Sequence, residues 1–235
     1  MPTFFYNGEL LQNSRISLSE EESLHCIKVL RLQQRDNVKI LNGKGQIFNG
    51  LLSNISKKKV EVELLEPQQV FNRKYFLHIA IAPTKSADKI EWFIEKAVEI
   101  GIDKISFFYS KYSERKKLRT DRIKRRAISA LKQSGNPILP EINELTSFEK
   151  TFENIKEDQR FIAFEKTKPN DSLLKQIDYE NSYFVLIGPE GGFNKKEVEL
   201  AIENGCQTAS LANYVLRTET AGVATCSMLN AVHLK

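Results

Sequence analysis

The chain has 235 residues, a mass of 27.0 kDa and a formal net charge of +5, with 41% hydrophobic and 28% charged residues. This composition is typical of a soluble globular protein with one large domain or two small ones, and no apolar run approaches the ~20 residues of a membrane span. The first residues lack the pattern of a signal peptide, and the three cysteines and three histidines are scattered without CxxC spacing. We therefore expect a cytoplasmic protein without disulfides or a metal site.

The first 70 residues are predicted to form a small β-barrel with one helix. Ser19 and Glu22 form a capping box for that helix, which is expected to run to about Leu30 and to contain a packed, non-catalytic His25. Asn42-Gly43 predicts a hairpin turn. Five extended or alternating segments are predicted strands: residues 3–6, 14–18, 37–41, 46–52 and 58–65.

From residue 75 the pattern changes to alternating strands and helices, which predicts a largely parallel sheet covered on both faces. Ser86 and Thr120 are predicted to cap two of the helices. The polar segment 66–74 is the expected boundary between a domain of residues 1–70 and a domain of residues 73–235. The strands of the second domain are expected at residues 75–82, 104–109, 160–165, 183–187 and 208–211.

The positive charge is concentrated between Lys104 and Lys132, where eleven Lys or Arg stand against two acids. The simpler interpretation is a solvated helix face, which is the usual role of a charge run. The alternative is an electrostatic surface for a polyanion, most simply nucleic acid. Because the whole excess lies in one segment, we favour the second interpretation.

Two glycine-containing stretches near the end of the chain indicate a binding site. Residues 185–193 read VLIGPEGGF, a buried strand that runs into three glycines, where a ligand can approach the main chain. Asn194 and Glu197 then predict a capped helix. Residues 214–222 read YVLRTETAG and place four polar residues, 217–220, in a loop before a helix of small residues. We expect both stretches to lie at the carboxyl ends of neighbouring strands, where open α/β sheets bind ligands.

Each stretch also has a simpler explanation. A tight strand-to-helix turn accounts for the glycines, and an ion pair within the loop accounts for Arg217 and Glu219. Neither stretch has the residue order of a P-loop or of GxGxxG, and the sequence offers no GxSxG elbow and no evident nucleophile–base pair. Kinase and hydrolase activities are therefore disfavoured, while two such loops close in sequence favour a pocket.

The stretches LIGPEGGFNKKE and SLANYVLRTETAG resemble the cofactor signature of the bacterial 16S ribosomal RNA (uracil-N3)-methyltransferases, which are S-adenosylmethionine-dependent enzymes of the knotted SPOUT superfamily. Two positions depart from the family pattern, Ala212 in place of a glycine and Thr3 in place of a frequent arginine. Ala212 is expected to affect the backbone contacts with adenine, and Thr3 removes one expected contact with RNA. The similarity extends over nearly the whole chain, with further matches in HCIKVLR (25–31), PTKSADKIEWFIEKAVEIG (83–101), YSER (112–115), KQSG (132–135) and Pro140-Glu141.

The resemblance implies an α/β protein with an N-terminal PUA-like β-barrel for RNA and a C-terminal SPOUT domain tied in a deep trefoil knot. It also implies a homodimer without metal that methylates N3 of one uridine, uridine 1498, in the 16S ribosomal RNA of the small subunit, with S-adenosylmethionine as the cofactor. Two alternatives stay open: a non-catalytic ribosome-assembly factor, which needs no cofactor pocket, and methylation of another nucleoside such as a tRNA ribose.

The expected chemistry begins with loss of the N3 proton, because the neutral imide nitrogen is a poor nucleophile. Arg217 is expected to donate to the resulting uracil anion or to orient the cofactor carboxylate, and Glu219 or Glu190 to accept the proton. A structural role for both glutamates is an equally open alternative. The residues expected to hold the cofactor are Leu186, Gly188, Pro189, Glu190, Gly191, Gly192, Leu211, Leu216, Arg217, Thr218, Thr220 and Ala221.

Contacts with RNA phosphates are expected from the basic segment and from one arginine of the first domain. Lys85 and Lys89 are expected to face the same cleft as the cofactor. The residues expected to bind RNA are Arg31, Arg115, Lys116, Lys117, Arg122, Arg125 and Arg126.

Overall fold

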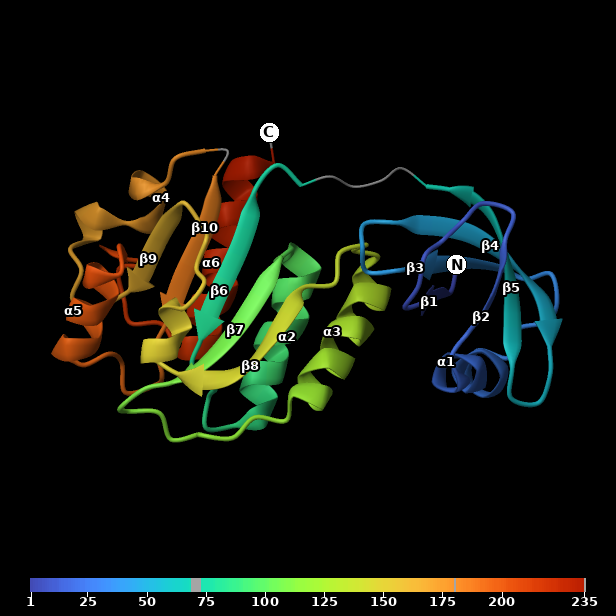
Figure 1. Cartoon of the computed structure of the whole chain (residues 1–235), viewed down its shortest axis with the longest axis horizontal. Coiled ribbons are helices and arrows are strands. Elements are labelled where there is room, and N and C mark those ends of the chain that lie inside the picture. Colours follow the sequence, from blue (N-terminus) through green and yellow to red (C-terminus); the bar gives the residue numbers. More distant parts are fainter. Residues whose placement is uncertain (69–72, 180, 235) are drawn as a thin grey trace. The chain divides into compact units, whose positions relative to one another are not determined.

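The computed structural model describes residues 1–68, 73–179 and 181–234 (Figure 1). The chain divides into two compact units. The first comprises the described residues of Met1–Asn72 with Ile128–Leu139, and the second those of Arg73–Ala127 with Pro140–Lys235. Of the boundary predicted at 66–74, residues 66–67 belong to strand β5 (Val60–Pro67) and residues 69–72 lie outside the described residues. The division into domains 1–70 and 73–235 stays a prediction.

The first unit is built on a curled five-stranded sheet in the order β1-β3-β4-β5-β2, the half-barrel form of the predicted barrel (Figure 1). Only β1 and β3 are parallel; the other neighbours are antiparallel. Burial alternates along β4 and β5, so that Phe48, Leu52, Val62 and Leu64 line one core. The strands are β1 (Thr3–Phe5), β2 (Arg15–Ser17), β3 (Asn37–Leu41), β4 (Ile47–Ile55) and β5 (Val60–Pro67).

The helix of the first unit begins where the sequence predicted and then changes type. The Ser19 side chain accepts a hydrogen bond from the Glu22 N–H (3.2 Å) at the start of α1 (Glu20–Leu24). The chain continues as the π-helix η1 (His25–Val29), which ends with the Leu30 N–H bonded to the His25 carbonyl. The wider π turn changes which side chains face inward: His25 is exposed and its neighbour Cys26 is buried. The prediction of a packed His25 is therefore wrong.

The second unit contains a six-stranded, all-parallel sheet in the order β11-β9-β10-β6-β7-β8, which confirms the predicted mostly parallel α/β class (Figure 1). Its central strands are almost entirely buried, as expected for a sheet covered on both faces. The trefoil knot stays a prediction. The strands are β6 (Phe76–Ile81), β7 (Lys104–Tyr109), β8 (Glu141–Ser147), β9 (Gln159–Ala163), β10 (Ser182–Ile187) and β11 (Gln207–Ala209).

Helices cover both faces of this sheet. Helices α2 (Ala87–Ile100) and α6 (Thr218–His233) pack against each other and α6 against β6 and β10, while α5 (Lys195–Glu203) packs on the face that carries Ala80 and Phe184. Figure 1 shows α2 and α6 together behind the central strands. None of the helices in the described ranges has the length and apolar character needed to cross a membrane. The remaining helices are α3 (Thr120–Ser134), η2 (Glu149–Phe152), η3 (Pro169–Asp171) and α4 (Leu173–Gln176).

Three predictions of local structure differ from what is observed. Strand β8 was not predicted, because its sequence EINELTS is polar and only partly buried at the sheet edge. Thr120 is the first residue of α3 rather than its cap, and its hydroxyl donates to the Glu144 carboxylate (2.6 Å). Residues 218–220 are the first turn of α6 rather than a loop. Helix α3 thus begins one residue before the start expected with Thr120 as cap, and α6 begins at Thr218 although the helix was expected only after residue 220. In both helices the first threonine is engaged by a distant partner, Glu144 for Thr120 and the Gly188 carbonyl for Thr218.

Candidate active site

A cavity of about 630 Å³ lies at the carboxyl ends of β9, β10 and β11 in the second unit. The loop after β10 contributes residues 187–193, and the chain after β11 contributes residues 209–218 with Ala221. The two glycine-containing stretches therefore meet as expected, but their strands are not neighbours, because β9 lies between β10 and β11. Because β9 lies there, the loop after β9 supplies a third wall of the cavity.

The loop after β10 needs its glycines for two physical reasons. Gly192 has φ of +70°, a left-handed conformation that side chains rarely adopt, and its N–H closes a turn onto the Pro189 carbonyl (2.8 Å). A Cβ on Gly188 or Gly191 would lie 2.9 Å from the Phe193 ring or 2.8 Å from Tyr112 Cβ. The loop then enters α5 through the predicted capping box, which is confirmed between Asn194 and Glu197.

Arg217 stands at the start of α6 and lines the cavity with an exposed side chain. The next residue, Thr218, donates its hydroxyl to the Gly188 carbonyl (2.9 Å), which ties the start of α6 to the glycine loop. The free N–H groups of a helix start and an arginine form a favourable place for an anionic group.

Glu190 is fixed at the cavity by its neighbours. One of its oxygens accepts a hydrogen bond from the Lys85 N–H (3.0 Å), while the residue itself remains exposed. Arg115 holds the same segment by donating to the carbonyls of Thr84 (3.0 Å) and Lys85 (2.7 Å). The loops after β6 and β7 thus position a carboxylate that belongs to the loop after β10.

Three of the predicted cofactor or catalytic residues do not line the cavity. Leu186 is fully buried within β10, Thr220 is exposed elsewhere on α6, and Glu219 is 7% exposed. The Glu219 carboxylate lies 3.6 Å from the Lys89 ammonium, and its second oxygen is buried without a hydrogen-bond partner among the described residues. The other predicted cofactor residues all line the cavity.

The wall formed by the loop after β9 was not predicted from the sequence. Phe164, Glu165 and Thr167 line the cavity. The Thr167 hydroxyl oxygen is buried and has no partner within the described part of the chain, and a Cβ on Gly192 would face the Glu165 carboxylate at 3.5 Å. This loop contains no glycine and no recognisable motif. The position of β9 between the other two strands was the missing information.

The residues predicted to bind RNA fall into two groups. Arg31 is exposed in the first unit with φ of +54°, and Lys116, Lys117 and Arg125 are exposed in the second. The other three, Arg115, Arg122 and Arg126, make contacts within the second unit. Among residues 1–68, 73–179 and 181–234, no group of three or more potential metal ligands gathers.

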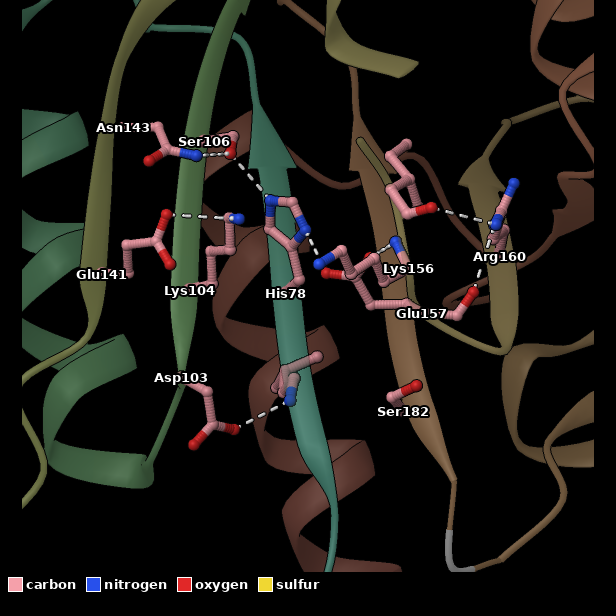
Figure 2. A network of polar contacts seen from close by, with 12 residues as sticks. His78, Asp103, Lys104, Ser106, Glu141, Asn143, Lys156, Glu157, Arg160 and Ser182 are labelled. Atoms are coloured by element: carbon pink, nitrogen blue, oxygen red, sulfur yellow. Dashed lines mark hydrogen bonds and ion pairs between the residues drawn. The ribbon is translucent and has the colours of Figure 1, made fainter. Parts of the chain in front are cut away.

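A second polar cluster lies inside the same sheet, at His78 (Figure 2). The ring nitrogens of His78 lie 2.6 Å from the Glu157 carboxylate and 2.7 Å from Ser106 Oγ, which also accepts from the Asn143 amide. Burial lowers the pKa of His78 below its ordinary value of 6.5, although Glu157 acts in the opposite direction. Burial acts to raise the pKa of Glu157, but its contacts with His78 and the hydrogen bonds from main-chain N–H groups of Lys156 and Glu157 together outweigh burial and lower this pKa below its ordinary value of 4.5. A neutral His78 can donate a hydrogen bond to Glu157 from one ring nitrogen and accept one from the Ser106 hydroxyl at the other, so both ring nitrogens are paired.

These two shifts predict a protein that loses stability in acid. Both groups have a lower pKa in the folded than in the unfolded chain, so the unfolded chain binds protons first as the pH falls. We expect the free energy of unfolding to decrease below about pH 6.5 because of His78, by up to ~1.4 kcal/mol per pH unit, and further below about pH 4.5 because of Glu157. Urea titrations across this range measure it. His78→Gln should flatten the first decrease, and the exposed His25→Gln should not; equal slopes in all three proteins would contradict the assignment.

The comparisons with known proteins agree with this geometry. A family model described as an RNA methyltransferase domain matches residues 72–230, and one described as an RNA methyltransferase PUA domain matches residues 18–65. The chain is 30% identical to the ribosomal RNA small subunit methyltransferase E of Rickettsia conorii, over 93% of this chain and 91% of that protein. It is 26% identical to the protein of that name from Bacillus subtilis, over 87% and 85%.

Two solved structures are similar over nearly their whole length. A probable rRNA-methyltransferase from Porphyromonas gingivalis has a TM-score of 0.89 and 31% identity, over 99% of this chain and 98% of that one. A methyltransferase from Legionella pneumophila, solved with bound cofactor SAM, has a TM-score of 0.86 and 25% identity, over 98% and 97%.

Proposed function

The chain belongs to the RNA methyltransferase family whose curated relatives are named ribosomal RNA small subunit methyltransferase E, and from this we propose that it transfers a methyl group from S-adenosylmethionine to N3 of one uridine in the RNA of the small ribosomal subunit. The observation that carries the proposal is the cavity, where a glycine loop, a helix start and Arg217 converge. The reaction belongs in the cytoplasm, where the subunit is assembled.

The proposal also includes the trefoil knot and a homodimer. The homodimer is supported by Tyr214 and Val215, which are 87% and 80% exposed beside the cavity and form an apolar surface of the kind that a second subunit covers.

The residues of the cavity fit S-adenosylmethionine. The volume lies in the range of ligand sites. The Thr167 hydroxyl has no hydrogen-bond partner among the described residues and the Glu165 carboxylate offers two acceptors, so both suit ribose hydroxyls. Arg217 and the start of α6 suit a carboxylate. When bound, the cofactor supplies an activated methyl group on a sulfonium, so this chain has only to position the uracil and manage its proton.

The proton and the charge of the uracil are assigned to two residues of the cavity. Glu190 is the proton acceptor in this proposal, since one of its oxygens is held by the Lys85 N–H and the residue is exposed at the cavity, whereas Glu219 lies outside the lining. The N3 anion spreads onto O2 and O4, where donors are most effective if they are already in place. Arg217 is the cation among the lining residues and is assigned to this charge.

Replacing Thr167 by Val should have opposite effects on stability and on ligand binding. In the free protein no residue of the described ranges pairs with this buried hydroxyl, so its removal should raise the free energy of unfolding by about 1 kcal/mol. If the hydroxyl binds the cofactor, affinity for the product S-adenosylhomocysteine should fall about five- to tenfold. Urea unfolding and calorimetric titration measure the two effects. The matched control is Thr151→Val, whose hydroxyl donates to Ser147 (3.1 Å) away from the cavity; it should lose stability and keep the affinity. Unchanged affinity in Thr167→Val would remove Thr167 from the cofactor site.

The experiment that tests the function uses small ribosomal subunits from cells that lack this protein. They are incubated with the protein and labelled S-adenosylmethionine, and the digested RNA is analysed by mass spectrometry. We expect one N3-methyluridine per subunit at a single site. If the protein binds the cofactor but no label enters the subunit RNA, the assignment of the pocket is retained and the assignment of the substrate is wrong. Transfer RNA would then be tested. Absence of cofactor binding would favour the non-catalytic assembly factor.

A further inference from the structure

The cations around α3 are sorted by direction into two groups. Arg122 and Arg126, one helical turn apart, both contact the Glu91 carboxylate on α2, and Arg126 lies 3.5 Å from it. Glu91 is only 3% exposed, so it needs these guanidinium groups as counter-charges. Arg126 also lies 3.4 Å from Glu95. The two arginines therefore neutralise acids of α2 and hold the two helices together.

Arg115 is also held by contacts within the second unit. Its guanidinium donates to two carbonyls of the loop after β6, as described above. Its donors are directed at the main chain of its own domain, which leaves it poorly placed to form a bidentate contact with a phosphate.

A second group of cations points outward. Its members are exposed and have neither an acidic side chain nor a carbonyl as a side-chain partner in the described residues; Lys116 lies over the Tyr109 ring at 6.0 Å. On α3, position 124 lies on the side of the helix opposite Arg122 and Arg126. Position 125 lies roughly 60° around the helix from Arg122, on the side opposite the buried Ile123 and Ala127. We call this group the free cations: Lys116, Lys117, Arg119, Lys124 and Arg125.

The free cations are continuous with the cavity through the loop between β7 and α3. Within the second unit, a Cβ on Gly191 of the cavity would lie 2.8 Å from Cβ of Tyr112 on this loop. The Lys111 N–H donates to Glu197 at the start of α5 (2.8 Å). The segment that packs on the glycine loop thus leads directly to Lys116, Lys117 and Arg119. A polyanion bound along the free cations would run toward the cavity.

We propose that the free cations form the surface that binds the phosphates of the RNA substrate, and that Arg115, Arg122 and Arg126 are positioning residues of the fold that do not contact RNA. The inference rests on the proposed function and refines it by dividing the basic segment. When an exposed cation without an internal ion pair binds a phosphate, no pair within the protein has to be broken. Each such phosphate contact also releases a counterion, which favours binding. RNA is favoured over an anionic membrane because these cations approach a pocket proposed for a nucleoside.

The test compares Arg125→Gln with its matched control Arg122→Gln, three residues away on the same helix. Binding of a fluorescein-labelled RNA hairpin with unpaired uridines in its loop is followed by anisotropy at several potassium chloride concentrations. We expect Arg125→Gln to make the slope of log K against log salt shallower by about 0.7 to 0.9, and Lys124→Gln combined with it to double this change. Arg122→Gln should keep the wild-type slope and show a lower thermal midpoint, because Glu91 loses a partner.

The outcomes separate the inference from the proposed function. An unchanged slope in Arg125→Gln, or an equal change in both single variants, overturns the division of the cations but leaves the methyltransferase proposal intact. A wild-type protein that binds no RNA overturns both. Loss of affinity for phosphatidylserine vesicles in Arg125→Gln, without a change in the RNA slope, would assign the surface to a membrane instead.

Discussion

Arg217→Ala should lower the turnover of labelled methyl transfer about 10²- to 10³-fold, which corresponds to roughly 3–4 kcal/mol of transition-state stabilisation. The reason is the position of this side chain: it lines the cavity at the start of α6, next to Thr218, which is bonded to the glycine loop. A guanidinium held there is in place before negative charge develops on the uracil, so no reorganisation is needed during the reaction. The measurement is single-turnover methylation of small subunits.

Two further measurements decide which role Arg217 has. If it donates to the uracil anion, affinity for S-adenosylhomocysteine stays unchanged in Arg217→Ala; if it orients the cofactor carboxylate, this affinity falls with the turnover. Arg217→Lys keeps the charge without the planar fork and should recover part of the rate. Lys196→Ala, an exposed cation on α5, is the control for net charge. Full turnover in Arg217→Ala would remove the central residue from the mechanism.

Gly222→Ala should destabilise the protein although alanine favours helices. In an exposed helix this substitution stabilises by about 1 kcal/mol. Here a Cβ would lie 2.5 Å from the ring of the fully buried Phe93 and 3.2 Å from Ile81 Cδ1, where α6 packs on α2 and β6. Overpacking of this kind costs about 1–3 kcal/mol, which should exceed the gain. Urea unfolding gives the net effect.

The same substitution should also reach the cavity. If α6 moves to relieve the contact with Phe93, its first residues move with it, and these include Arg217 and Thr218. Displacements of about 1 Å can cost 10²-fold in rate. We therefore expect weaker binding of S-adenosylhomocysteine and slower methylation. Ser227→Ala, exposed on the same helix, should change neither. A stabilised and fully active Gly222→Ala would show that the interface between α2 and α6 tolerates a methyl group.

Some features of this protein are determined by the sequence itself because they depend on near neighbours. The alternation of strands and helices after residue 75 predicted the parallel sheet. The glycines of 188–192 identified the loop, and Asn194 with Glu197 identified the start of α5, since a capping box needs only four consecutive residues. The resemblance carried by the two glycine-containing stretches led to the family that the comparisons support.

The tertiary structure decided which residues share a site. Strand order brings β9 between β10 and β11, so Glu165 and Thr167 enter the cavity without any motif of their own, while Glu219 turns into the interior beside Lys89. It also decided which charges are available: Arg122 and Arg125 are alike in sequence, yet only Arg122 faces Glu91. The same physical reason explains which residues line the cavity and which cations lack an internal partner. Local pattern fixes the period of an element, but the partner of a side chain depends on which distant element packs against it.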